Sequence, residues 1–171
     1  MPAVARFTQQ FTPWSHYLHA VVDIAFPAHS IRVTRSTGGV SGLPYPLHSA
    51  ETIHIVTAFN PGGRNATAQA NLRAQHELLH HISLRGLQRW PAVGGDLDDS
   101  HAEISAAVVG MDDAQARALG RRFGQDAVFA WSPSSWRLLA CADTAHDSVS
   151  AGWHAAILEP ASRRFTRWPA R

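Results

Sequence analysis

The spacing of apolar residues predicts strands and helices in alternation. Residues 52–59 (TIHIVTAF) are rich in β-branched side chains and apolar at successive positions, which is typical of a strand buried on both faces. Residues 66–84 repeat apolar positions on one helical face, with Asn65 as the expected N-cap. Residues 13–26 carry apolar side chains three and four positions apart, so this spacing predicts another helix.

Shorter apolar runs predict further strands over residues 31–34, 87–93, 102–109, 126–131, 135–141 and 153–158. Asp112 and Gln115 have the spacing of a capping box, and Gly124 follows the apolar stripe of the helix they would begin. From residue 52 onward the order is therefore strand, helix, strand, strand, helix, strand. This order predicts an α+β fold with a ferredoxin-like split βαβ core.

The ferredoxin-like arrangement would place the strand at 52–59 between the strands at 102–109 and 126–131. A chain of 171 residues suits one domain. We expect the single domain to comprise a core at about 50–141, an N-terminal helix and a C-terminal extension over 142–171 with extra strands.

Polar residues from separated segments would meet at one edge of this sheet. They are Asn60 after the first core strand, Asn71 in the next helix, Glu103 at the start of the third strand and Gln125 before the fourth. Amides both donate and accept hydrogen bonds, and a carboxylate in an apolar strand is costly to bury without a partner. The cluster therefore predicts a site for a small polar ligand, with Glu103 as candidate catalytic base and Arg64 as a further ligand-binding residue.

The same cluster has a structural interpretation. Asn before Pro is common in turns, Gln125 follows a helix end, and Glu103 could bond a loop or an arginine such as Arg64. The alternative to a ligand site is therefore a structural or partner-binding module.

Several of these residues also carry a resemblance. The segments TAFNP at 57–61, EIS at 103–105 and FGQDA at 123–127, with a W-x-x-Y pattern at Trp14 and Tyr17, resemble an uncharacterised bacterial family. The resemblance covers most of residues 14–141. That family has no assigned activity, so it implies site residues without chemistry: Asn60, Asn71, Glu103, Ser105 and Gln125.

A second motif points to metal chemistry. His76, Glu77 and His80 match H-E-x-x-H, in which two histidines on one helix face bind zinc and the glutamate activates water. Both histidines, however, should face solvent, and Ser83 stands where the extended pattern has glycine. We predict no metal and no cofactor, and a zinc-dependent hydrolase is the least favoured alternative.

Composition excludes several classes of protein. Hydrophobic residues make up 45% and charged residues 16% of the chain, unlike a disordered protein. The single cysteine, Cys141, excludes a disulfide scaffold and suits a reducing compartment. No apolar run is long enough to cross a membrane, and the first residues lack a signal-peptide pattern. We therefore expect a cytoplasmic protein with no membrane partner.

Charge argues against a dedicated nucleic-acid binder. The formal net charge is +2, and all 15 basic residues are arginines spread along the chain. An arginine-rich tail at 163–171, with Phe165 and Trp168, could contact an acidic partner, but a solvated tail is the simpler interpretation. The sequence decides neither the oligomeric state nor whether a reaction is catalysed.

Overall fold

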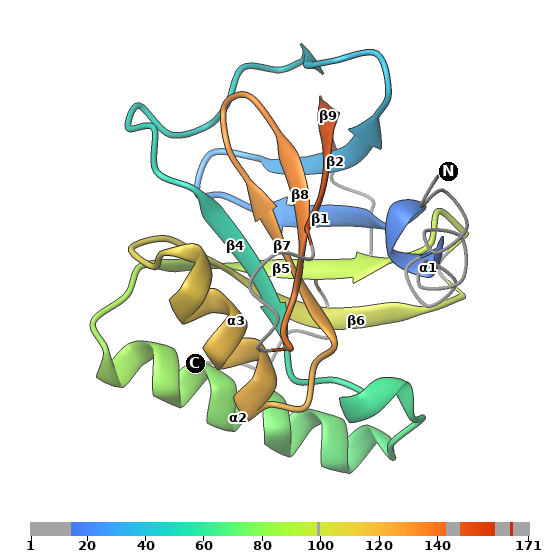
Figure 1. Cartoon of the computed structure of the whole chain (residues 1–171), viewed down its shortest axis with the longest axis vertical. Helices are drawn as coiled ribbons and strands as arrows, with labels where there is room; N and C mark the ends of the chain where they lie inside the picture. The colour runs from blue at the N-terminus through green and yellow to red at the C-terminus, as the bar shows by residue number, and fades with distance from the viewer. Residues whose placement is uncertain (1–14, 99, 143–147, 160–164, 166–171) are drawn as a thin grey trace, which may run out of the picture.

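The computed structural model describes residues 15–98, 100–142, 148–159 and 165 (Figure 1). The helices within these residues are α1 (Ser15–Leu18), α2 (Ala68–Leu84), α3 (Asp113–Arg122) and the short 3-10 helix η2 (Pro61–Gly63). The strands are β1 (Val21–Ala25), β2 (Ser30–Ser36), β3 (Ser41–Gly42), β4 (Ile53–Thr57), β5 (Arg89–Gly95), β6 (Ala102–Val108), β7 (Ala127–Trp131), β8 (Trp136–Ala140) and β9 (Ser148–Ile157).

Eight of the strands form a closed antiparallel barrel. The sheet order is β2-β1-β5-β6-β4-β7-β8-β9-β3, and β2 also pairs with β9. That pairing runs from Ile31 opposite Ile157 to Ser36 opposite Gly152 and joins the two sides of the sheet. Strand β3 is an addition that pairs in parallel with β9. Closure gives each of the eight barrel strands a partner on both sides.

The predicted ferredoxin-like α+β class is therefore wrong. Strand β4 does lie between β6 and β7, which confirms its predicted neighbours. The sheet does not end there, however, because β1 and β2 extend it beyond β5, while β8 and β9 extend it beyond β7. Helices α2 and α3 cover one face of β4, and closure of the barrel covers the other.

The prediction of a helix over 13–26 is also wrong. Only Ser15–Leu18 are helical, and Val21–Ala25 form β1. A short apolar run fits both the helical period and the strand period, and here the pairing of Val21–Ala25 with β2 and β5 produces a strand. Trp14 lies outside the described residues.

The barrel wall separates two hydrophobic cores. The first fills the interior and includes side chains from all eight barrel strands, among them Trp131, Trp136 and Trp153. The second lies between the outer face of β4, β6, β7 and β8 and the two longer helices, where Leu78, Ile82 and other residues of α2 and α3 pack. This double burial explains why residues 52–59 are apolar on both faces.

Local signals determine where the two longer helices begin. The capping box of α3 is confirmed, because Asp112 and Gln115 exchange side-chain and backbone hydrogen bonds. Helix α2 begins two residues later than expected, since the hydroxyl of Thr67 accepts from the backbone of Ala70 and Thr67, rather than Asn65, is the N-cap.

No helix among the described residues combines the length and the apolar character that a membrane span requires. The arginines of the predicted tail lie outside the described residues.

Candidate functional site

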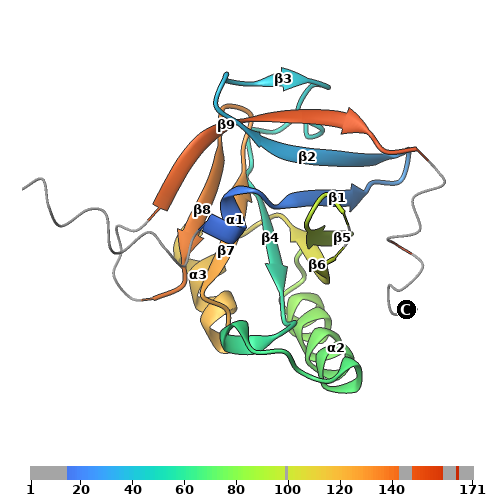
Figure 2. The same ribbon diagram turned by 90° about the vertical axis from the view of Figure 1, so that its right-hand side faces the viewer.

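The predicted site residues lie at one end of the barrel, here called the α1 end. Strand β4 ends there, β6 and β7 begin there, and α1 lies beside them (Figure 2). Pairing sets the alignment: Thr57 of β4 lies opposite Ser105 of β6, and Glu103 follows on the same face of β6. Gln125 stands two residues before β7.

Asn60, Asn71 and Glu103 form one hydrogen-bonded cluster. The side chain of Asn60 donates from Nδ2 to Glu103 Oε1 at 3.0 Å and accepts at Oδ1 from Asn71 Nδ2 at 3.0 Å. The backbone N–H of Asn60 donates to Asn71 Oδ1 at 2.8 Å, and that of Ala66 to Asn60 Oδ1 at 3.1 Å. Asn60 has a left-handed backbone with φ of 48°, which asparagine tolerates better than most residues.

Gln125 contacts the same loop from its other side. Its Nε2 donates to the carbonyl oxygen of Phe59 at 2.9 Å and to that of Phe123 at 3.3 Å. Next to it, the N–H of Gly62 donates to the carbonyl oxygen of Gly124 at 2.7 Å. Gln125 therefore ties the loop after β4 to the turn before β7 and does not contact Glu103 directly.

Glu103 differs from the other carboxylates embedded in the fold. Asp23, which is 0% exposed, receives two hydrogen bonds from Arg32, and Asp113 pairs with Arg137. Within the described part of the chain, the one hydrogen bond to the Glu103 carboxylate comes from the neutral amide of Asn60. Burial raises the pKa of Glu103, although the Asn60 hydrogen bond and His101 act in the opposite direction.

Tyr17 brings a further polar group to the α1 end. Its ring packs edge-on against Phe129, with 6.2 Å between centroids. Burial raises the pKa of Tyr17 to about 12, and the nearby carboxylates of Asp126 and Glu103 contribute to this shift. The hydroxyl of Tyr17 therefore lies in the same environment as Glu103.

The last two predicted residues differ in their surroundings. Ser105 is buried, and its hydroxyl donates to the carbonyl oxygen of Glu103 at 3.1 Å. Arg64 is exposed on the loop after η2 and forms no ion pair with Glu103.

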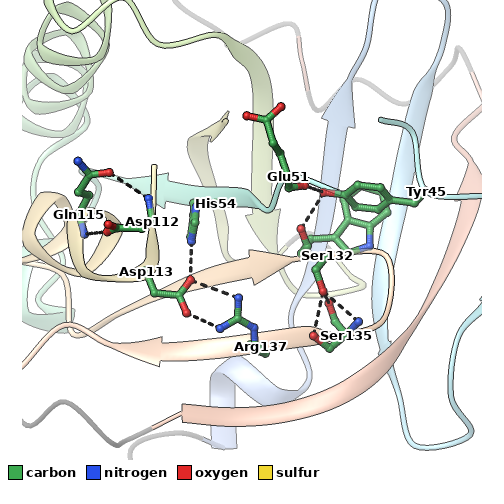
Figure 3. Close-up of polar contacts among 10 residues, drawn as sticks. Tyr45, Glu51, His54, Asp112, Asp113, Gln115, Ser132, Ser135 and Arg137 are labelled. Atoms are coloured by element: carbon green, nitrogen blue, oxygen red, sulfur yellow. Dashed lines mark hydrogen bonds and ion pairs between the residues drawn. The ribbon is translucent and has the colours of Figure 1, made fainter. Parts of the chain in front are cut away.

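A second polar cluster, His54, Asp113 and Arg137, was missed in the sequence (Figure 3). Nε2 of His54 lies 2.9 Å from Asp113 Oδ1, and the guanidinium of Arg137 donates to both oxygens of Asp113. Burial lowers the pKa of His54, an effect that Asp113 partly offsets. Burial would raise the pKa of Asp113, but the hydrogen bonds from Arg137 and His54 outweigh it and lower that pKa. The sequence feature that could have indicated this cluster is His54, a histidine within an apolar strand.

The H-E-x-x-H residues form no comparable cluster. His76, Glu77 and His80 are all exposed on α2. Among the residues that the structure describes, no group of three or more His, Cys, Asp or Glu side chains is placed to hold a metal ion.

Comparison with known proteins finds a family model that matches part of the chain. Neither the curated proteins nor the solved structures gave a match. Residues 56–128, less than half of the chain, match the model of a family described as "Protein of unknown function (DUF3293)". The matched segment contains Asn60, Asn71, Glu103, Ser105 and Gln125 but leaves out β1, β2, β8 and β9. The comparison therefore supports a domain family of unknown function over β4 to the start of β7.

Proposed function

We propose that the protein binds a small polar ligand at the α1 end of the barrel, with Glu103 as the residue that contacts the ligand. The observation that carries this proposal is the state of Glu103 itself. Its carboxylate is half-buried at the end of an apolar interior and faces a single neutral donor, Asn60 Nδ2. A carboxylate whose pKa is raised by burial and that forms no ion pair with the described residues is costly to maintain for structure alone.

In this proposal the amides position the ligand-binding group. Asn71 fixes Asn60 through two hydrogen bonds, and Asn60 fixes Glu103 Oε1. Gln125 holds the same loop through the carbonyl of Phe59. Glu103 Oε2 remains available to a hydrogen-bond donor of the ligand, since no hydrogen bond from the described residues occupies it. We also propose a cytoplasmic location, which the single cysteine supports.

The alternative function, a structural or partner-binding module, has its own support. Asn60, Asn71 and Gln125 direct their amides mainly at one another and at loop backbone. If that were their whole purpose, Glu103 would be one more anchor of the loop after β4.

A thermal-shift screen with a library of small polar molecules tests the proposal. A ligand that binds the folded state raises the melting temperature in proportion to its concentration and affinity. We expect at least one chemical class to stabilise the wild-type protein and the control variant Glu77→Gln, which makes the same chemical change at an exposed position of α2. The shift should disappear in Glu103→Gln. Equal shifts in wild type and Glu103→Gln, or none with any compound, would favour the structural alternative.

A further inference from the structure

An arginine on the interior face of the barrel lies toward the same end as Glu103. Ile31 and Val33 of β2 belong to the interior core, and alternation along a strand places Arg35 on that same face. Its partner across the β2–β9 ladder is Trp153, which is also part of the interior core. Arg35 is half-buried, and its Nε is buried without a hydrogen-bond partner among the described residues.

Other embedded arginines of the barrel and α3 do have partners. Arg32 pairs with Asp23, and Arg137 with Asp113. Arg117 and Arg121 of α3 donate to the backbone carbonyls at the end of β8. Arg35 is the exception, and an unsatisfied guanidinium N–H is costly in an apolar interior.

Strand pairing connects Arg35 to Glu103. Glu103 lies opposite Gly94 on β5, Gly94 lies opposite Val22 on β1, and Val22 lies opposite Val33 on β2. All four therefore face the interior along one row across the sheet. Arg35 is two residues nearer the α1 end than Val33, so the guanidinium and the carboxylate enter the interior at the same end from strands three apart.

Gly94 carries no side chain in the row between them. A Cβ added at this glycine would meet no heavy atom closer than 3.8 Å, and that atom is the hydroxyl oxygen of Ser105. This part of the interior therefore presents the carboxylate of Glu103, the hydroxyl of Ser105 and a guanidinium whose Nε has no partner among the described residues, which are groups that bind a polar molecule. An anionic group would satisfy Arg35, because guanidinium groups bind carboxylates and phosphates through paired hydrogen bonds.

We infer that the ligand of the α1 end is a small molecule with an oxyanion, carboxylate or phosphate, which Arg35 binds, and an amino or hydroxyl donor, which Glu103 binds. This inference rests on the proposed function and adds the chemical class of the ligand. A single ligand between them would pair with both charged groups, so Arg35 and Glu103 need not contact each other directly. The segment matched to the family does not include Arg35.

Calorimetry with defined probes tests this inference. The probes are free amino acids, primary amines and carboxylic acids of matched chain length, and the monophosphates of amino alcohols. We expect binding by probes that carry both groups and weak or no binding by the simple amines and acids. Comparing the affinity for the amino acids with that for the amino alcohol monophosphates shows whether the oxyanion is a carboxylate or a phosphate. Failure of all bifunctional probes to bind would overturn the inference.

Variants of Arg35 and Glu103, with one control and one change at Gly94, separate this inference from the proposed function. Arg35→Gln should weaken binding roughly 10- to 100-fold, as expected for loss of a charged hydrogen-bond pair, whereas Arg73→Gln on the exposed face of α2 should leave it unchanged. Gly94→Val, which adds a side chain beside Ser105 and Glu103 without changing charge, should also abolish binding. If Glu103→Gln prevents binding while Arg35→Gln does not, the proposed function stands and the oxyanion site is refuted. If neither Glu103→Gln nor Arg35→Gln changes the affinity, the proposed function and this inference are both refuted.

Discussion

Replacing Glu103 with glutamine distinguishes a ligand-binding carboxylate from a structural one without knowledge of the ligand. Gln has the same shape, and its Oε1 can still accept from Asn60 Nδ2, which lies 3.0 Å from Glu103 Oε1. The change weakens one charge-assisted hydrogen bond, worth about 1.5–3 kcal/mol, to a neutral one of about 0.5–1.5 kcal/mol. It also removes the cost of an ionised carboxylate in a half-buried place. Because the two effects oppose each other, we expect the free energy of unfolding at pH 7 to change by less than about 1 kcal/mol, or roughly 2–4 °C in melting temperature.

The pH dependence gives a sharper result. Because burial raises the pKa of Glu103 above its ordinary value of 4.5, the folded state retains this proton at a pH where the unfolded state has lost it. Glu103 therefore reduces stability as pH rises through that window, by about 1.4 kcal/mol for each unit of pKa shift. Glu103→Gln cannot titrate, so its stability relative to wild type should improve between pH 4 and 7.

Urea unfolding of wild type, Glu103→Gln and the exposed control Glu77→Gln across this pH range measures the difference. A loss of more than about 1.5 kcal/mol at pH 7 in Glu103→Gln, with no improvement relative to wild type as pH rises, would refute the reasoning. Glu103 would then be an anchor of the loop.

Three further predictions concern the scaffold. Gly120→Ala should destabilise the protein by about 1–2 kcal/mol, because the new Cβ would lie 2.4 Å from Cys141 Sγ and this overpacking outweighs the better helix propensity of alanine. The loss should be smaller in a Cys141→Ala background, which a double-mutant cycle measured by urea unfolding would show. Asn60→Ala should cost more than Asn60→Gly, since both lose the side-chain bonds but only alanine is strained at φ of 48°; equal losses of stability would contradict this. Burial lowers the pKa of His54 below 6.5, so wild-type stability should fall as pH drops below about 6.5, and His54→Gln should show a shallower fall in unfolding free energy; identical slopes would be inconsistent with a neutral buried His54.

The sequence predicted the neighbours of β4 because crossover rules act on the local order of strands and helices. It did not predict closure, because closure depends on β2 pairing with β9 more than a hundred residues away. No local pattern encodes that pairing. The misassigned helix at 13–26 had a related cause, since Val21–Ala25 is short and its apolar residues satisfy the helical period as well as the strand period.

The candidate site was likewise only partly predictable from the sequence. Asn60, Asn71 and Glu103 could be grouped from the sequence because the predicted strand order correctly placed the end of β4 beside the start of β6. Arg35 could not, because its approach to this end depends on β1 pairing with β5 and β2, and the sequence pattern predicted a helix where β1 forms. His54 and Arg137 were missed because a single polar residue in an apolar strand does not reveal its partner, here Asp113 at the start of α3.

The distribution of side chains inside the barrel indicates from which end a ligand would enter. Tyr45, at the end opposite α1, packs against Trp131, with ring centroids 5.1 Å apart, and its ring lies 6.4 Å from that of Trp153, the cross-strand partner of Arg35. The hydroxyl of Tyr45 shares its one hydrogen between the carbonyl oxygens of Glu51 and Trp131, which holds Tyr45 in place; Figure 3 shows Tyr45 beside Glu51. At the α1 end the ring of Tyr17 packs against Phe129, and Gly94 and the carboxylate of Glu103 face the interior on neighbouring strands. For the proposed ligand, entry at the α1 end, past Tyr17, is the route that agrees with the position of Glu103, because the cluster around Tyr45 fills the opposite end.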